Sequence, residues 1–316
     1  MVGGDFLSIV NTDVPMTSER CRRILGELSR LCPQCRGLEL TQSFYGRPVS
    51  ALEIGTGPRK VIFSAAHHGN EWLTATVLLK FAEDLIRAIG ENGTIWGVPA
   101  KTITEYSTLC LIPMVNPDGV DLVTGAIGPG DPGYDNAVTL SENYPSIPFP
   151  SGWKANLLGV DLNLQYPAGW LQAREIKFSQ GYTRPGPRDY VGRAPLNQKE
   201  SFALADYTAE TDPWLVLALH SQGNVIYWKF RDYQVPGAKE LAEEFARVSG
   251  YALEETPYAS SFAGYKDWFI QEYRRPGFTI EVGTGENPLP TEQFDEIYKN
   301  VLGILVTAAT GLPGGV

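Results

Sequence analysis

The stretch KVIFSAAHHGNEWLTATVLLKFAEDLIRAIG (Lys60–Gly90) predicts a buried strand that leads directly into a helix. Its first part is an almost continuous apolar run that ends at Gly69, which is typical of a strand covered on both faces. The residues from Glu71 to Gly90 have the pattern and the terminal glycine of a helix. Two adjacent histidines, His67 and His68, therefore lie at the junction of the two elements.

Strands and helices alternate in the same way through the rest of the chain. The other expected elements are strands within 44–57, 107–116, 213–222 and 278–285, and helices within 17–32, 239–250 and 291–311. This alternation predicts an α/β layered sheet. No linker divides the sequence, so we expect one domain over residues 1–316. The stretch from Gly119 to Pro195, rich in Gly, Pro and Tyr, is expected to form long ordered loops at one edge of the sheet.

Composition and charge exclude several classes of protein. Hydrophobic residues make up 43% of the chain and charged residues 20%, as in ordinary soluble globular proteins. The net charge of −10 argues against a general nucleic-acid binder, because phosphate backbones require a basic face. No apolar stretch reaches membrane-spanning length, and the N-terminus lacks the features of a secretory signal. We therefore expect a cytoplasmic protein, with a trimmed exported enzyme as the alternative.

Two of the four cysteines, Cys32 and Cys35, form the motif CPQC, which has the spacing of metal or redox sites. No second CxxC follows, and the surrounding RLCPQCRG looks like the end of a helix. We therefore expect reduced cysteines with no role in metal binding or redox chemistry.

Polar side chains follow four of the predicted strands at the point where each strand ends. His68 and Glu71 follow the first strand, and Asn116, His220 and Glu281 follow three others. Ligands of α/β sheets bind at the carboxyl ends of the strands. We therefore expect these side chains to meet at one edge of the sheet.

His68, Glu71 and His220 together predict a metal site. Two histidines and one carboxylate are the protein ligands of many catalytic zinc ions, with a fourth position open for water. We therefore expect one Zn²⁺ per chain. His68 is the expected ligand because it stands three residues before Glu71, whereas His67 would point to the opposite side of the strand end and have a supporting or structural role.

Glu281 is the candidate general base. It ends a predicted buried strand, where a carboxylate without a role is unfavourable. Beside zinc it can take a proton from water and pass it to a leaving amine. The alternative is a structural ion pair with a core Arg or Lys.

The motifs HHGNE, NPDG, GVDLN, LHSQG and TIEVG, in this order, resemble those of the zinc metallocarboxypeptidases of the carboxypeptidase A type. They extend from His68 to Glu281 and so cover most of the chain. The resemblance implies a single-domain α/β/α sandwich with a central mixed, mostly parallel sheet. It also implies a peptide substrate, the same zinc ligands and the same base.

The resemblance implies roles for four further residues. Asp161 corresponds to the partner that orients the first zinc-binding histidine, and Asn163 to an asparagine that helps bind the terminal carboxylate of the substrate. Lys154 stands where the family has an arginine that polarises the scissile carbonyl, and it offers a point charge without the planar fork. Tyr258 is near the place of the family's mobile tyrosine, after one inserted residue is allowed.

Leu164 departs from the digestive members of the family, which have at this position an arginine that grips the C-terminal carboxylate. The segments VDLNLQYPAGW and QGYTRPGPRDYVG instead resemble bacterial γ-D-glutamyl-L-diamino acid endopeptidases. These enzymes cut cell-wall peptides (muropeptides) between D-glutamate and meso-diaminopimelate or lysine. We expect Arg188 to meet a substrate carboxylate, with Arg184 and Arg193 as alternatives. No wall-binding LysM repeat precedes the catalytic sequence, which favours an intracellular recycling or sporulation-linked role or a chain cut from a longer protein.

Three other functions remain open on the sequence. A conventional zinc carboxypeptidase would use another arginine for the terminal carboxylate. A zinc deacylase of the aspartoacylase-like type shares HxxE and a later histidine, but NPDG and TIEVG favour the peptidase. A non-catalytic peptide-binding module would have lost ligands or base, and all four are present. The oligomeric state and the choice between diaminopimelate and lysine are not predicted.

Overall fold

The computed structural model describes residues 8–311, and its centre is one mixed β-sheet. Among these residues eight strands form the sheet, in the order β1 (Cys35–Gln42), β2 (Pro48–Ile54), β6 (Ser107–Ile112), β3 (Arg59–Ser64), β7 (Leu215–His220), β10 (Gly277–Glu281), β8 (Val225–Tyr227) and β9 (Ala252–Glu254). β3 pairs in parallel with β6 and β7, and β7 pairs in parallel with β10. The pairs β1–β2, β2–β6 and β8–β10 are antiparallel. The four central strands therefore end at the same edge of the sheet.

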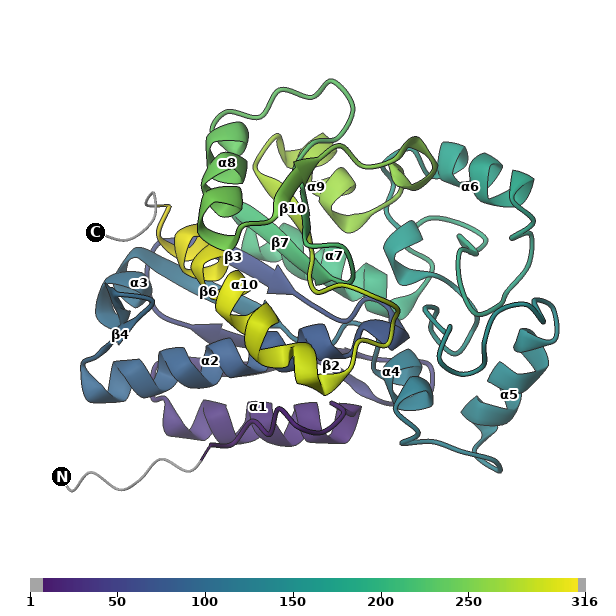
Figure 1. The fold of residues 1–316 in the computed structure, drawn as a ribbon, viewed down its shortest axis with the longest axis horizontal. Helices are drawn as coiled ribbons and strands as arrows, with labels where there is room; N and C mark the ends of the chain where they lie inside the picture. The colour runs from purple at the N-terminus through teal and green to yellow at the C-terminus, as the bar shows by residue number, and fades with distance from the viewer. Residues whose placement is uncertain (1–7, 312–316) are drawn as a thin grey trace.

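Helices cover both faces of the sheet because the side chains of the central strands alternate between two cores. Val61 and Phe63 of β3 are buried in one core, and Ile62 between them is buried in the other. The helices that complete the first core are α1 (Ser18–Leu31), α2 (Leu73–Glu91), α3 (Ala100–Tyr106), α8 (Ala238–Ser249) and α10 (Phe294–Thr310), some of which lie in front of the sheet in Figure 1. Those that complete the second core are α6 (Trp170–Ser179), α7 (Lys199–Thr211) and α9 (Tyr265–Tyr273). The predicted α/β/α architecture is confirmed.

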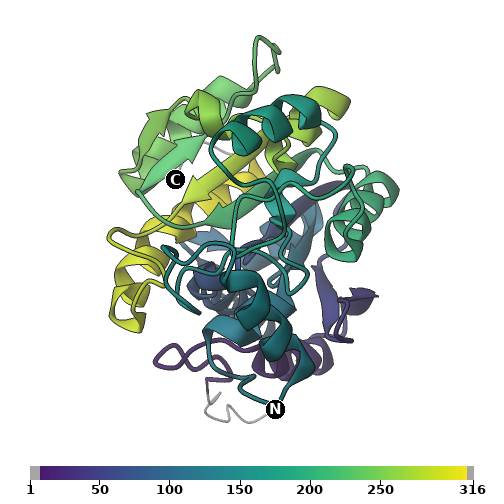
Figure 2. The same ribbon diagram turned by 90° about the vertical axis from the view of Figure 1, so that its right-hand side faces the viewer.

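The segment between Gly119 and Pro195 contains more helix than expected. It holds the end of α4 (Pro117–Val123), then α5 (Pro132–Ser141), the short 3₁₀ helix η2 (Leu162–Leu164) and α6. α5 begins with a sequence signal, since Asp131 accepts a hydrogen bond from the backbone of Gly133 and Pro132 occupies the first helical position. The rest of the segment is irregular and lies at the side of the molecule that faces the viewer in Figure 2.

Several elements were not predicted from the sequence. They are β1, which lies before the range 44–57 in which both of the first strands were expected, then α3, α7, α9, β8, β9 and the small separate sheet of β4 (Thr94–Ile95) and β5 (Val98–Pro99). None of the helices within residues 8–311 is long and apolar enough to cross a membrane.

The motifs HHGNE and NPDG meet because two backbone segments cross without side chains between them. A Cβ atom added to Gly69 would lie 2.5 Å from the carbonyl oxygen of Gly119. A Cβ atom added to Gly119 would lie 2.5 Å from the carbonyl oxygen of Ala155. Only glycine allows these approaches without displacement of the backbone. The glycines therefore fix the distance between the strand-end histidines and the loop that carries Lys154.

A Gly69→Ala variant is expected to lose about 1–3 kcal/mol of unfolding free energy, because its methyl group would overlap rigid backbone. Urea denaturation measures this change. Gly26→Ala is the matched control. Gly26 lies within α1, and an added Cβ atom would have no neighbour within 4 Å, so we expect a gain of about 0.5–1 kcal/mol. An unchanged midpoint for Gly69→Ala would contradict the close crossing.

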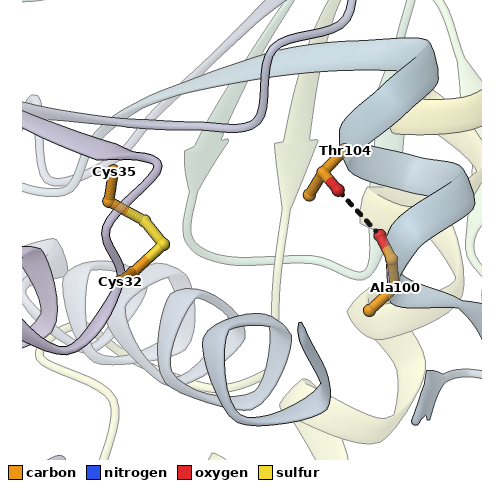
Figure 3. The surroundings of a disulfide bond; sticks show 4 residues. All are labelled: Cys32, Cys35, Ala100 and Thr104. Carbon is orange, nitrogen blue, oxygen red and sulfur yellow. Dashed lines mark hydrogen bonds between the residues drawn. A yellow bond between two sulfur atoms is a disulfide. The ribbon is translucent and has the colours of Figure 1, made fainter. Parts of the chain in front are cut away.

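Cys32 and Cys35 form a disulfide bond in the structure, so the expectation that both are reduced is wrong (Figure 3). α1 ends at Leu31, and the turn that follows brings the two residues to a Cα–Cα distance of 5.2 Å at the start of β1. This separation is within the usual range for a disulfide. Cys21 and Cys110 are buried free thiols, as expected.

Candidate metal centre and active site

The strand-end residues meet at one edge of the sheet because the strands that carry them are parallel neighbours. His220 is the last residue of β7, which pairs with β3, and His68 follows β3. Glu71 ends the short 3₁₀ helix η1 (Gly69–Glu71) that begins directly after His68. Glu281 is the last residue of β10 and is the register partner of His220. The predicted convergence of these side chains is confirmed.

His68, Glu71 and His220 offer one ligand atom each, and these atoms all lie within 4.8 Å of one another. The two carboxylate oxygens of Glu71 face the two rings, at 2.8 Å from Nδ1 of His68 and 2.9 Å from Nδ1 of His220. All three side chains are buried. Two imidazole nitrogens and a carboxylate aimed at one point fit the donor set of a single catalytic zinc ion.

Neighbouring charges determine the protonation of this cluster. Burial disfavours the charged form of the His68 ring, but the carboxylates of Glu71 and Asp161 outweigh it and raise the pKa to about 9. Burial alone would raise the pKa of Glu71, yet His68 and Lys154 hold it well below its usual value. Glu71 is therefore an anion, and a metal cation could take the place of the proton that His68 holds beside it.

Asp161 lies on the far side of His68 from the ligand cluster. Its Oδ1 atom is 3.2 Å from Nε2 of His68 and also accepts a hydrogen bond from the backbone of Asn163. The ring is therefore held at both nitrogens, by Glu71 on one side and by Asp161 on the other. This is the arrangement in which an outer carboxylate orients a histidine toward a metal.

His67 takes no part in the cluster. Its ring is fully buried and stacks on His220 at a centroid distance of 5.2 Å, with Tyr265 at 5.9 Å. Burial, with a smaller effect from His220, lowers the pKa of His67 well below its usual value. His67 is therefore a neutral packing residue beneath His220, which agrees with the structural role expected for it.

Asn116 has a role that its position in NPDG does not reveal. Its side-chain amide nitrogen donates to the carbonyl oxygens of His67, Lys154 and Ala155 at 3.0–3.2 Å. Its side-chain oxygen accepts from the backbone of Gly119 at the start of α4. One amide therefore ties together the strand end, the helix start and the loop that carries Lys154.

The ligand cluster opens into a cleft of about 250 Å³. Four further expected site residues line it, namely Glu281, Lys154, Asn163 and Arg188. Leu164, which differs from the digestive members of the family, lines it as well. The structure therefore brings together eight of the expected site residues: these four and His68, Glu71, His220 and Asp161. Tyr258 is not, because its side chain is 72% exposed and packs edge-on against Phe262 outside this cleft.

Glu281 and Lys154 are the acidic and the basic group of the cleft, and the pKa of each is raised by its surroundings. Burial raises the pKa of Glu281, and the nearby carboxylate of Glu71 adds to this effect. The ammonium of Lys154 is 3.1 Å from Oε1 of Glu71, and this carboxylate overcomes the effect of burial and raises the pKa of the lysine. Glu281 is therefore a carboxylate with increased basicity, and Lys154 is a firmly charged donor.

Arg188 is the arginine that the structure brings to the cleft, whereas Arg184 and Arg193 are exposed and do not line it. Its Nε atom donates to Asp189 at 2.8 Å, and the other oxygen of Asp189 accepts from Lys177 at 2.6 Å. Sequence reasoning missed Asp189 and Lys177, since nothing in a loop sequence shows which charges will pair. Together they hold the guanidinium of Arg188 at the cleft.

The cleft continues past Glu281 into a second hollow of about 540 Å³. Lys154, Arg188 and Glu281 line both parts, so they stand at the boundary between them. The remaining lining of the outer hollow includes residues of the loop at 146–152 and of the segment 285–287. We call the two parts the inner cleft and the outer hollow.

Comparisons with known proteins agree with this geometry. A family model described as zinc carboxypeptidase matches residues 21–302. The γ-D-glutamyl-L-diamino acid endopeptidase 1 of Lysinibacillus sphaericus is 44% identical over 280 residues, which cover 89% of this chain and 68% of that protein.

Two solved structures show the same fold. Thrombin-activatable fibrinolysis inhibitor superposes with a TM-score of 0.77 at 14% identity, over 99% of this chain and 78% of the other. The murein-tripeptide amidase MpaA from Escherichia coli O157 superposes with a TM-score of 0.53 at 17% identity, over 85% and 91%. The mixed sheet between two helical layers is therefore the arrangement that the sequence motifs imply.

Proposed function

The chain belongs to the zinc carboxypeptidase family, and from this premise we propose that it hydrolyses the bond between D-glutamate and the diamino acid of bacterial cell-wall peptides. The observation that carries the proposal is that the cleft has its arginine at a different position from the one the resemblance implies. Leu164 lines the cleft where the resemblance places a carboxylate-binding arginine, and Arg188 lines it from a different loop. The 44% identical relative, named for this activity, supports the same substrate class.

Each residue of the site has a separate part in the proposed reaction. Zinc, when bound by His68, Glu71 and His220, supplies a Lewis acid that polarises the scissile carbonyl and acidifies water. Glu281 accepts the proton of the attacking water and later delivers it to the nitrogen of the leaving amine. The ammonium of Lys154 stabilises the negative charge that develops on the carbonyl oxygen.

The two parts of the cleft suit an internal bond rather than a terminal one. Because Glu281 and Lys154 stand at the boundary, the scissile amide would lie between them, with the acyl half in the outer hollow. The D-glutamyl residue carries a free α-carboxylate beside the scissile side-chain amide, and Arg188 reaches both parts of the cleft. Its Nε is held by Asp189, which leaves the outer edge of the guanidinium for this carboxylate.

An Arg188→Met variant is expected to raise KM for a γ-D-glutamyl peptide by about tenfold or more, since a charged hydrogen bond to the substrate is lost. The effect on kcat should be smaller, because the proton-transfer groups remain. Steady-state kinetics separate the two constants. Arg184→Met is the matched control, since Arg184 is exposed and outside the cleft. Equal effects of the two substitutions would contradict the role given to Arg188.

The deciding experiment compares two substrates with zinc-loaded protein. We expect release of meso-diaminopimelate from L-Ala-γ-D-Glu-meso-diaminopimelate and little hydrolysis of an N-blocked dipeptide with a free C-terminus. The reverse preference would identify a conventional carboxypeptidase. Hydrolysis of neither substrate by protein with bound zinc would overturn both.

A further inference from the structure

A buried carboxyl group that the proposed reaction does not use is bonded to the loop that carries Lys154. It belongs to Glu200, the second residue of α7, which is 1% exposed. Its Oε1 atom accepts a hydrogen bond from the side-chain amide of Asn156 at 3.4 Å. Within residues 8–311 no lysine, arginine or histidine lies within ion-pair distance of this carboxyl group. Burial without a cation partner favours the neutral form of an acid.

Asn156 joins the start of α7 to a turn at 156–160. Its side-chain nitrogen donates to Gln198 at 2.8 Å as well as to Glu200. Its side-chain oxygen accepts two backbone N–H groups of the turn, each at 3.1 Å. Asn156 is itself 1% exposed, and all four bonding positions of its amide are occupied. The turn is therefore tied to the side chain of Glu200 through one buried amide.

The turn at 156–160 stands between two residues of the site. Lys154 precedes it, and the ammonium of this lysine is 3.1 Å from Oε1 of Glu71. Asp161 follows it and is 3.2 Å from Nε2 of His68. A displacement of the turn would therefore move the cation that faces the developing oxyanion. It would also move the carboxylate that orients the first zinc ligand.

The charge on Glu200 determines how strongly it attracts the amide of Asn156. The separation of 3.4 Å is longer than the roughly 2.7–3.2 Å of ordinary N–H···O bonds, so the present bond is weak. A carboxylate anion forms shorter and stronger bonds than a neutral carboxyl group. Ionisation of Glu200 would therefore draw the amide toward α7, and the backbone groups bonded to the amide oxygen would follow.

We propose that Glu200 is a positioning residue of the active site, which acts through Asn156 and keeps the turn at 156–160 in place while its carboxyl group is neutral. Ionisation displaces the turn, weakens zinc binding through Asp161 and lowers kcat through Lys154. The effect on kcat rests on the proposed function, whereas the effect on zinc binding does not.

The change of charge falls near neutral pH. Burial raises the pKa of Glu200 from 4.5 to about 7, and Asp118 of α4 acts in the same direction. The backbone N–H of Glu200, Asn156 and Lys199 oppose this shift, and Arg47 pairs with Asp118 at 2.9 Å. Since the folded protein keeps a proton that the unfolded chain releases, stability falls as the pH rises from about 4.5 to 7 and then levels off.

The test compares the wild-type protein with Glu200→Gln, which has nearly the same shape and stays neutral at every pH. With L-Ala-γ-D-Glu-meso-diaminopimelate we expect equal kcat at about pH 6 and a wild-type value about fivefold lower than that of the variant at about pH 8, because displaced groups lose their alignment. The zinc dissociation constant of the wild-type protein should rise about fivefold relative to the variant over the same range. The metal-free variant should have the higher melting temperature above pH 7, and the two melting temperatures should converge toward pH 4.5.

Glu210→Gln is the matched control, because Glu210 is an exposed glutamate of the same helix. It should behave as the wild-type protein in all three measurements. Glu200→Leu is a second neutral variant, and it cannot accept the bond from Asn156. It leaves a buried N–H group without a partner, so its kcat and zinc affinity should lie below those of Glu200→Gln by a factor that does not depend on pH.

The possible failures are distinct. A ratio of wild type to Glu200→Gln that stays constant between about pH 6 and 8, in kcat and in zinc affinity, would overturn the inference. A pH-dependent difference in melting temperature alone would also overturn it, since Glu200 would then titrate without moving the site. Equal kcat and zinc affinity in Glu200→Leu and Glu200→Gln would exclude Asn156 as the connection. Failure of the zinc-loaded protein to hydrolyse the tripeptide would overturn the proposed function, and zinc affinity would still decide the inference.

Discussion

A Glu281→Gln variant is expected to lose about a thousandfold in kcat on a γ-D-glutamyl tripeptide while it still binds zinc. Glutamine has nearly the same shape but cannot accept the proton of the attacking water, and general acid–base groups contribute about 10²–10⁴-fold. Zinc binding should persist because the ligand atoms belong to His68, Glu71 and His220. Steady-state kinetics and metal analysis of the purified variant measure the two properties separately.

The folded state should tolerate this substitution. No described residue forms a hydrogen bond with the Glu281 side chain, and burial, with a further contribution from Glu71, disfavours the charged form and raises the pKa. A neutral amide removes this repulsion, so we expect a melting temperature equal to or above that of the wild-type protein. Glu272→Gln, an exposed glutamate on α9, is the control and should keep full activity. Near-normal turnover in Glu281→Gln would exclude Glu281 as the base.

The sequence predicted the centre of the site because strand ends follow a general rule. His68, His220 and Glu281 each stand where an apolar run ends, and parallel strands bring such positions to one edge. The rule needs only the order of apolar runs along the chain. It does not need the strand order across the sheet, which no local pattern shows.

The residues around this centre could not be found in the same way. Asp189 and Glu200 lie outside the central strands, and their partners depend on how distant segments pack. Asp189 also has a left-handed backbone with φ of 64°, which a single loop sequence does not predict for aspartate. α5 is a different case, since Asp131 and Pro132 gave a usable helix start that the surrounding glycines and prolines obscured.

The disulfide shows the limit of reasoning from motif context. The absence of a second CxxC argued against a four-cysteine zinc site. It says nothing about whether the two cysteines of the single motif bond to each other. Whether Cys32 and Cys35 bond to each other depends on the turn after α1, which places them 5.2 Å apart between Cα atoms. The spacing CPQC is compatible with such a turn, so context alone was not enough to exclude the bond.

A His220→Ala variant is expected to lose its bound zinc and with it about a thousandfold or more of activity. The substitution removes one of three protein ligands, and it also leaves Oε2 of Glu71 without the ring nitrogen that faces it at 2.9 Å. We expect a stoichiometry far below the wild-type value of about one zinc per chain after dialysis. Metal analysis by mass spectrometry measures this, and activity measured with excess zinc shows how much of the loss is binding.

His67→Phe separates the two neighbouring histidines. The ring of His67 stacks on His220 and packs at a tilt against Tyr265, and neither of its nitrogens has a partner within residues 8–311. Phenylalanine keeps the stacking and removes two buried polar atoms without partners, so the variant should fold and hold about one zinc per chain. A loss of zinc from His67→Phe as large as that from His220→Ala would contradict the packing role of His67 and indicate that it binds the metal. Retention of zinc would show that His67 is not a zinc ligand, in agreement with the stacking of its ring on His220.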